Sequence, residues 1–325
     1  MVDLFDLSLV LWAVIPPLLL LGYYSCRIPF APPPLRLLMF FLIGALSGIL
    51  ALSLEWIFEI VANWFVDWQQ IRGWLPGIAL RQILEVGSIE ESCKLAAVVV
   101  PTYYLQRRYQ LLPSSVFLFT IAIAFGFTAE ENWVYLFYGT ASIIDRTIGT
   151  PVHAMFSAPW GYALGIYISS NTRLNRDKKF IVRAWLNSII CHALVNVLSS
   201  AWRYSLPLRF LSYGLFPFLL WMFWRLEQLL RKVQGKRSIT LISGNTPQRR
   251  YWQSSLVLFA LVLGGNAIFG LFLLARVLSP LNPSKLFDSD ILWFILTRFS
   301  LNLFFGVLAW GIYRYLRHSA PPRYF

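Results

Sequence analysis

The chain has 325 residues, of which 58% are apolar and only 13% are charged, and its mean hydropathy is +0.60. A soluble globular domain carries about 25% charged residues, so too few charges remain here to cover a water-facing surface of this size. The net charge of +13 would suit a nucleic-acid-binding protein, but the basic residues lie in short connections between apolar blocks. We therefore expect an integral membrane protein that has no nucleic-acid partner.

The apolar residues come in blocks of about 20, the length that a helix needs to cross the hydrocarbon core of a bilayer. The sequence lacks the alternation of apolar and polar residues that marks a membrane β-barrel. It therefore predicts an all-α, polytopic transmembrane bundle of about nine spans. In chain order, the expected spans cover residues 7–26, 35–56, 79–104, 114–138, 149–170, 181–201, 206–226, 252–278 and 289–313.

The Lys and Arg residues are distributed unevenly over the connections between these spans. Most of the 28 lie in the connections that would share one side with the carboxyl terminus. Because cytoplasmic loops are enriched in Lys and Arg, this distribution favours an amino terminus outside the cell and a carboxyl terminus inside. We expect a multi-pass protein of the plasma (cell inner) membrane.

One polar linker divides the predicted spans into two groups. Residues 231–251 (RKVQGKRSITLISGNTPQRRY) are the only sizeable polar connection. They predict a membrane-embedded core at 1–230 and a two-span tail at 252–325. The basic residues of the linker would lie in the cytoplasm, where anionic lipid headgroups attract them; a dedicated binding segment is the alternative.

The span at 79–104 contains Glu90, Glu91 and Lys94 near its middle. Ionisable side chains inside a spanning helix are costly and usually mark a functional site. Glu90 and Lys94, at i and i+4, share one helix face and can pair, whereas Glu91 points about 100° away. A buried ion pair that fixes helix packing would explain Glu90 and Lys94 but would leave Glu91 without a counter-charge.

Two carboxylates also lie on the next predicted span, at 114–138. Glu130 and Glu131 sit well inside its apolar run and are followed by Asn132. Lys94 alone cannot neutralise all the carboxylates of these two spans. We therefore expect either a bound metal ion or carboxyl groups that stay protonated.

Two of the three histidines lie on the spans that follow. His153 opens the span at 149–170, and His192 lies midway along the span at 181–201, with Asn196 one turn further on. Zinc is commonly bound by His and Glu ligands with an open water position, while another Glu acts as general base. The four spans from 79 to 201 together suggest hydrolytic metal chemistry inside the membrane.

Small residues follow His153 at four-residue steps, namely Ser157, Gly161 and Gly165. Such a stripe lets neighbouring helices approach closely, which would bring ligands from separate helices into one site. The third histidine, His318, lies in the basic tail after the last predicted span, where we expect it to be solvated.

At these residues the sequence resembles the PrsW-type intramembrane metalloproteases, distant relatives of the CAAX-processing and abortive-infection membrane proteases. EESCK (Glu90–Lys94) is similar to the family's EExxK, and FTAEEN (Phe127–Asn132) to its FxxxE with a following Asn. HAMFSAPWG (His153–Gly161) resembles the third motif, and HALVN (His192–Asn196) the HxxxN motif. Each motif is short, but the four occur in the right order, each on its own predicted helix. The resemblance covers about residues 34–201.

The resemblance implies a peptidase that hydrolyses membrane-anchored protein substrates within or near the membrane. Glu90 or Glu91 would be the general base, Lys94 would orient a catalytic carboxylate and Asn196 would stabilise the oxyanion. A zinc ion would be the cofactor, held by His153 and His192, with Glu131 as a further candidate ligand. A metal-independent, glutamate-based mechanism, which is known among relatives, is the alternative chemistry.

Two other functions would also use buried Glu, Lys and His residues. A proton- or ion-coupled transporter needs such groups, but transporters favour broken helices in paired halves of the chain, and the charged motifs here crowd into the spans from 79 to 201. A non-catalytic scaffold that binds transmembrane helices would not need the acid and base residues, all of which are present. The peptidase is therefore the favoured function.

Overall fold

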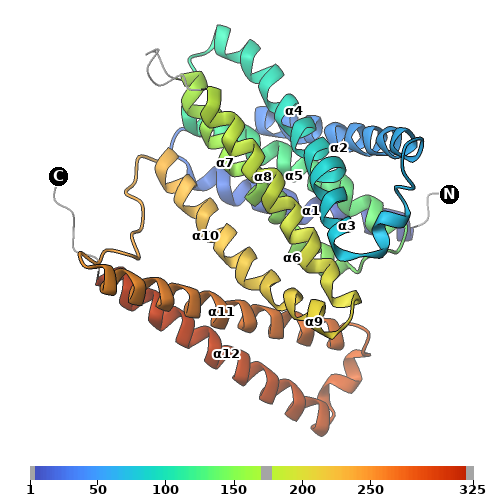
Figure 1. Cartoon of the computed structure of the whole chain (residues 1–325), viewed down its shortest axis with the longest axis vertical. Coiled ribbons are helices and arrows are strands. Elements are labelled where there is room, and N and C mark those ends of the chain that lie inside the picture. The colour runs from blue at the N-terminus through green and yellow to red at the C-terminus, as the bar shows by residue number, and fades with distance from the viewer. Residues whose placement is uncertain (1–3, 170–177, 320–325) are drawn as a thin grey trace. The chain divides into compact units, whose positions relative to one another are not determined.

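The computed structural model describes residues 4–169 and 178–319 as helices joined by short connections (Figure 1). Residues 1–3, 170–177 and 320–325 lie outside the described residues, and they include the last residue of the predicted span 149–170 and part of the connection after it. The long helices are α1 (Leu4–Arg27), α2 (Pro34–Asn63), α4 (Gly87–Arg108), α5 (Pro113–Phe137), α7 (Val152–Ser169), α8 (Lys178–Ser200), α10 (Leu215–Val233), α11 (Pro247–Leu278) and α12 (Ser289–His318). Short helical segments join them: η1 (Gln70–Gly73), α3 (Leu75–Arg81), η2 (Gln82–Val86), α6 (Ile143–Gly149), η4 (Ala201–Arg203), α9 (Leu206–Arg209), η5 (Phe210–Gly214) and η6 (Pro283–Phe287). These described parts contain no strand, which confirms the predicted all-α class.

Within the described residues, seven helical segments are long and apolar enough to cross a membrane, which confirms a multi-pass membrane protein. They correspond to seven of the predicted spans: Leu7–Arg27, Pro34–Asn63, Pro113–Phe137, Lys178–Arg203, Leu206–Val233, Pro247–Leu278 and Ser289–His318. The two other predicted spans correspond to α4, whose apolar run is interrupted by three charged residues, and to α7, which has 18 residues. The count of nine spans and the orientation stay predictions.

The chain divides into two compact units. The first comprises the residues up to Val197 together with Arg225–Lys236, and the second comprises Leu198–Trp224 and the residues from Arg237 onward. Helix α10 therefore contributes to both units. The predicted segments 1–230 and 252–325 are a division along the chain and stay predictions.

Helix α5 is the centre of the first unit. Its residues from Ser114 to Ala129 are buried without interruption, and α1, α2 and α7 pack around it. Gly44 of α2 lies against the backbone of Ile123, and Gly126 of α5 lies against the backbone of Phe41. A Cβ atom at either glycine would collide with the facing backbone, so glycine allows the two helices to approach this closely.

The small-residue stripe of α7 faces the same central helix. Gly161 lies against the Thr120 side chain and Gly165 lies against Pro113, both of α5. The predicted close approach along this stripe is therefore confirmed. The contact packs the second half of α7 against the first half of α5, the helix that carries the second pair of carboxylates.

In the second unit, α11 and α12 lie side by side (Figure 1). Gly270 of α11 lies against the Asn302 side chain of α12, and this contact joins the two helices. The first half of α10 packs on α11 through aromatic contacts, with the Phe216 ring 5.2 Å from that of Phe269 and 5.6 Å from that of Phe272.

Candidate functional site

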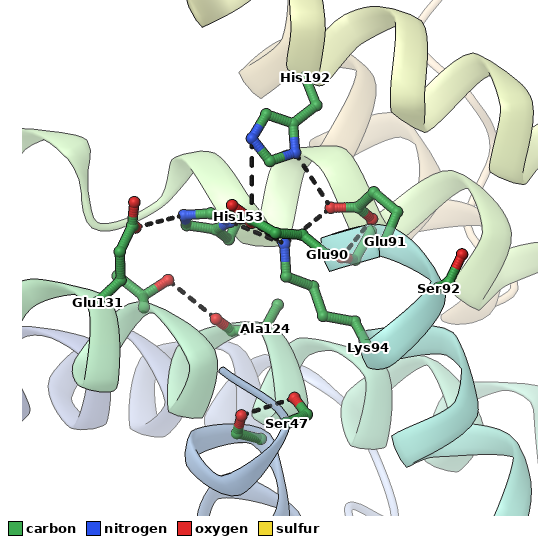
Figure 2. Close-up of polar contacts among 12 residues, drawn as sticks. Ser47, Glu90, Glu91, Ser92, Lys94, Ala124, Glu131, His153 and His192 are labelled. Carbon is green, nitrogen blue, oxygen red and sulfur yellow. Dashed lines mark hydrogen bonds and ion pairs between the residues drawn. The ribbon is translucent and has the colours of Figure 1, made fainter. Parts of the chain in front are cut away.

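The start of α4 carries three ionisable side chains into the interior of the first unit (Figure 2). Glu91 and Lys94 are fully buried, and Glu90 is 7% exposed. Lys94 Nζ donates to Glu90 Oε2 at 3.1 Å and to Glu91 Oε1 at 2.8 Å. The predicted pairing of Glu90 with Lys94 is confirmed. The expectation that Glu91 would lack a counter-charge is wrong, because residues at i and i+3 also meet on a helix surface and one ammonium group reaches both carboxylates.

Both oxygens of Glu91 are engaged. While Lys94 binds Oε1, Ser157 Oγ donates to Oε2 at 3.1 Å and Trp160 Nε1 donates to the same oxygen at 3.0 Å. Both of these donors come from α7. Sequence reasoning noted Ser157 only as a small residue and missed Trp160, whose one signal was its place inside the HAMFSAPWG run.

His153 bridges α4 and α5 through its two ring nitrogens. Its Nδ1 lies 2.9 Å from Lys94 Nζ, and its Nε2 lies 2.7 Å from Glu131 Oε2. A lysine ammonium group can only donate. His153 Nδ1 is therefore the acceptor of that bond, and the ring carries its proton on Nε2, which donates to Glu131.

Glu131 is also held by Arg146 from α6. Arg146 Nη2 donates to Glu131 Oε2 at 2.6 Å, and Arg146 Nε donates to Asn132 Oδ1 at 2.7 Å. Sequence reasoning missed this arginine, which it had counted only among the loop charges. The contact gives Glu131 a cationic partner and fixes the Glu131–Asn132 pair at the edge of the site.

His192 reaches the site from α8. Its ring stacks on the Phe156 ring at a centroid distance of 4.4 Å. Its Nε2 lies 3.9 Å from Glu90 Oε2 and its Nδ1 lies 3.6 Å from Glu91 Oε1, both too long for a direct hydrogen bond. In the described structure the buried Nδ1 has no hydrogen-bond partner, so the gaps around this ring suit a bridging water or a substrate group.

Glu90 is the carboxylate that faces both imidazoles. Its Oε2 lies 3.7 Å from His153 Nδ1 and 3.9 Å from His192 Nε2, and Figure 2 shows both rings turned toward it. Among the described residues, Lys94 supplies the hydrogen bond to this oxygen. Unlike Glu91, Glu90 keeps accepting capacity toward the space between the rings.

The remaining candidates lie further from this cluster. Asn196 lies one turn beyond His192, and its Nδ2 donates to Gln82 Oε1 at 2.7 Å. Glu130 packs against Gly48 of α2, and His318 is exposed at the end of α12, as expected. The structure thus brings together the six residues Glu90, Glu91, Lys94, Glu131, His153 and His192.

The donor types at this cluster suit zinc, but their arrangement does not. Of the predicted ligands, His153 has both ring nitrogens engaged, Nδ1 at 2.9 Å from Lys94 Nζ and Nε2 at 2.7 Å from Glu131 Oε2, so two of the three predicted ligands bind each other directly. The ammonium group of Lys94 occupies the position next to His153 Nδ1 and Glu90 where a cation would bind, and Glu131 contacts the opposite nitrogen of His153. No three His, Cys, Asp or Glu side chains of the described residues are placed to hold a metal ion.

The fold and the site define a multi-pass helical membrane protein with a buried Glu–Lys–His cluster suited to hydrolysis. The chain belongs to the PrsW family of intramembrane metalloproteases, because the model of that family matches residues 32–222. It is a peptidase, its substrate is a protein, and its surroundings include a lipid bilayer. The matched segment ends within α10, so α11 and α12 lie outside it.

Two curated relatives agree with this assignment. The chain is similar to Protease PrsW of Clostridioides difficile (strain 630), with 25% identity over 210 residues that cover 62% of this chain and 84% of that protein. It is also similar to Protease PrsW of Shouchella clausii (strain KSM-K16), with 28% identity over 235 residues that cover 69% of this chain and 98% of that protein. No solved structure matches the chain.

Proposed function

We propose that this peptidase hydrolyses peptide bonds of membrane-anchored proteins and that Glu90 is its general base. The observation that carries the proposal is the position of Glu90 Oε2, at 3.7 Å from one imidazole nitrogen and 3.9 Å from another. Lys94 fills the gap between Glu90 and His153, whereas the gap to His192 Nε2 exceeds a direct hydrogen bond, so a water molecule beside these two groups could bind to both. A carboxylate next to such a water can accept its proton during attack on a peptide carbonyl.

Glu90 is a better base than Glu91 because of their hydrogen bonds. Glu91 accepts from Lys94, Ser157 and Trp160, so its lone pairs are largely occupied. A carboxylate in that state is held rigidly and is a weak acceptor for a further proton. We assign Glu91 the role of fixing Lys94, and with it Glu90, against α7.

The other residues of the site position Glu90 and His153 or stabilise charge in this mechanism. Lys94 orients Glu90, and Glu131 fixes the ring and tautomer of His153 through the 2.7 Å contact with Nε2. Glu90 takes a proton from the water while the water oxygen bonds to the peptide carbon. Glu90 then gives this proton to the leaving amine as the carbon–nitrogen bond breaks. His192 and Asn196, at i and i+4 of α8, would stabilise the oxyanion, for which Asn196 would release Gln82.

The predicted zinc ion has no part in these steps, because Lys94 already supplies the positive charge between Glu90 and His153. The family is described as a metalloprotease, so metal binding needs its own measurement. Elemental mass spectrometry of the detergent-purified protein should compare the wild type with a His153→Ala/His192→Ala variant. About one zinc ion per chain, lost in the variant, would establish the predicted zinc site.

We also propose the plasma membrane as the location of the protein. The basic residues of the 231–251 connection would lie against anionic lipid headgroups on its cytoplasmic face.

The proposed activity is tested in membranes. Cells that express the wild type or the Glu90→Gln variant are compared by sequencing new amino termini in their membrane proteins. We expect termini that only the wild type produces, and the same loss in Glu91→Gln, His153→Ala and His192→Ala variants that still insert. Full cleavage by all four variants would contradict the proposed site.

A further inference from the structure

The turn before α4 contains a buried carboxylate that the proposed reaction does not use. This turn, η2 (Gln82–Val86), is π-helical, and Glu85 within it is fully buried at 0% exposure. Single π-helical turns inside helices are rare and are frequently found at functional sites. The residues that stabilise η2 can therefore affect the positions of the α4 carboxylates that follow it.

Glu85 is bound by three donors from two directions. Arg81 binds it in a bidentate manner, with Nη2 2.8 Å from Oε1 and Nε 3.0 Å from Oε2. Trp68 Nε1 donates to Oε2 at 2.5 Å. Trp68 belongs to the connection after α2, where its backbone N–H is held by Asn63 Oδ1 at 2.9 Å and its ring packs on Phe58. Glu85 thus fastens the turn before α4 to the end of α2.

A second contact binds the same turn to α8. Gln82 Oε1 accepts the 2.7 Å hydrogen bond from Asn196. Gly87, the first residue of α4, lies so close to α8 that a Cβ atom there would be 3.4 Å from the carbonyl oxygen of Ile189. Helix α8 also carries His192, so η2 lies between the anchor at Glu85 and the helix that supplies one of the site's imidazoles.

The rotation of α4 about its axis depends on this turn. A π-helical turn contains one residue more than an α-helical turn, so losing it would rotate one side of the helix against the other by about 100° per residue. Such a rotation would move Glu90 away from His153 and His192 and would move Glu91 away from α7. We propose that Glu85 is a positioning residue, which holds η2 through Arg81 and Trp68 and thereby places the two α4 carboxylates in the site. This inference rests on the proposed function of Glu90.

The alternative is a purely structural role, in which Glu85 only neutralises the charge of Arg81 and stabilises the fold. The double variant Arg81→Met/Glu85→Gln separates the two roles, because it removes both charges at once. If neutralisation is the only role, the double variant recovers both thermal stability and turnover relative to Glu85→Gln. If Glu85 positions α4, stability recovers while kcat stays low.

The experiment measures kcat and KM on a single-span peptide taken from a cleavage site found in membranes, together with the thermal unfolding midpoint in detergent. We expect Glu85→Gln to lower kcat about 10- to 100-fold with KM unchanged, and Trp68→Phe, which removes one donor and keeps a ring, to lower kcat less. The matched control is Glu227→Gln, which breaks another bidentate Arg–Glu pair, formed with Arg27 at 2.6 and 2.7 Å. This control should keep the wild-type kcat.

The outcomes separate the inference from the function on which it rests. Wild-type kcat in Glu85→Gln, with Glu90→Gln inactive, would overturn the positioning role alone. Wild-type kcat in Glu90→Gln would overturn the proposed function whatever Glu85 does. If Glu85→Gln does not fold, Trp68→Phe takes its place, and an unchanged kcat in that variant contradicts the proposal.

Discussion

Lys94 holds three of the site's polar side chains with one ammonium group. It is fully buried, and it contacts Glu90, Glu91 and His153, while its Nζ lies 4.0 Å from the centre of the Phe127 ring. A buried charge that loses its partner is strongly destabilising, whereas a network in which every member is satisfied is tolerated. The two carboxylates therefore depend on this one cation.

Replacing Lys94 by Met should destabilise the protein by about 3–5 kcal/mol, because two buried carboxylates lose their shared partner. The thermal unfolding midpoint in detergent measures this effect. Lys285→Met is the matched control, since Lys285 is exposed in η6, and its free energy of unfolding should change by less than about 0.5 kcal/mol. Equal midpoints for the two variants would show that the carboxylates do not depend on Lys94.

The two neighbouring glutamates should respond differently to the same substitution. Glu90→Gln removes the proposed base and should lower kcat by about 10²- to 10⁴-fold with little change in the unfolding midpoint. Glu91→Gln should lower both kcat and the midpoint, because Glu91 is an acceptor for Lys94, Ser157 and Trp160. The reverse pattern of midpoints would assign the structural role to Glu90.

Lys94 also determines the expected response to chelators. Because its ammonium group fills the cation position between Glu90 and His153, cleavage should persist after dialysis against a strong zinc chelator. The rate of peptide cleavage before and after dialysis tests this. Loss of activity that added zinc restores would instead support the metal ligands predicted from the sequence.

The sequence could predict the part of the site that one helix determines. The spacing of Glu90 and Lys94 implies their pairing, because side chains four residues apart share a face of any α-helix. Trp160 reaches Glu91 across 69 positions of the chain, and Arg146 reaches Glu131 from a separate short helix. Such contacts depend on how helices pack, and no local pattern carries that information.

Among the elements, α4 and α7 are the two predicted spans that are not among the seven described helical segments long and apolar enough to cross a membrane. Helix α4 carries three charged residues in its interior, and α7 is buried from His153 to Gly165 apart from Tyr162. Ionisable residues in spans almost always face the bundle interior, and small residues are enriched where helices pack closely. The sequence motifs made helices α4 and α7 predictable. The π-helical form of η2 was not, since its residues bind Trp68, in the connection after α2, and Asn196 of α8, both distant in the sequence.

The close contact between α5 and α7 gives a prediction at this scale. In Gly161→Leu the new Cβ would lie 2.6 Å from the Thr120 side chain, so the two helices must separate. We expect a loss of about 1–3 kcal/mol of stability, with reduced cleavage because His153 and Glu131 lie on these two helices. Gly22→Leu is the control, because nothing lies within 4 Å of its Cβ position. An equal unfolding midpoint for both variants would contradict the packing argument.

Over the whole molecule, three of the site residues lie toward ends of their helices that would face the same side of the membrane. Glu90 and His153 lie in the first turns of α4 and α7, and Glu131 lies near the carboxyl end of α5. If the amino terminus is outside, α4 and α7 run inward and α5 runs outward, so all three residues lie in the outer half of the membrane. The orientation predicted from Lys and Arg therefore also predicts where a substrate is cut.

Reporter fusions test this orientation. Alkaline phosphatase, which is active only outside the cytoplasm, should be active when fused after Lys285, in the connection between α11 and α12, and inactive when fused after His318. The last turn of α12 is basic, with Arg317 and His318, which favours its retention in the cytoplasm. Cleavage sites found in membrane proteins should then lie in the outer half of the bilayer or outside it. Active fusions at His318 would invert the topology and place Glu90, His153 and the cleavage sites in the inner half of the bilayer.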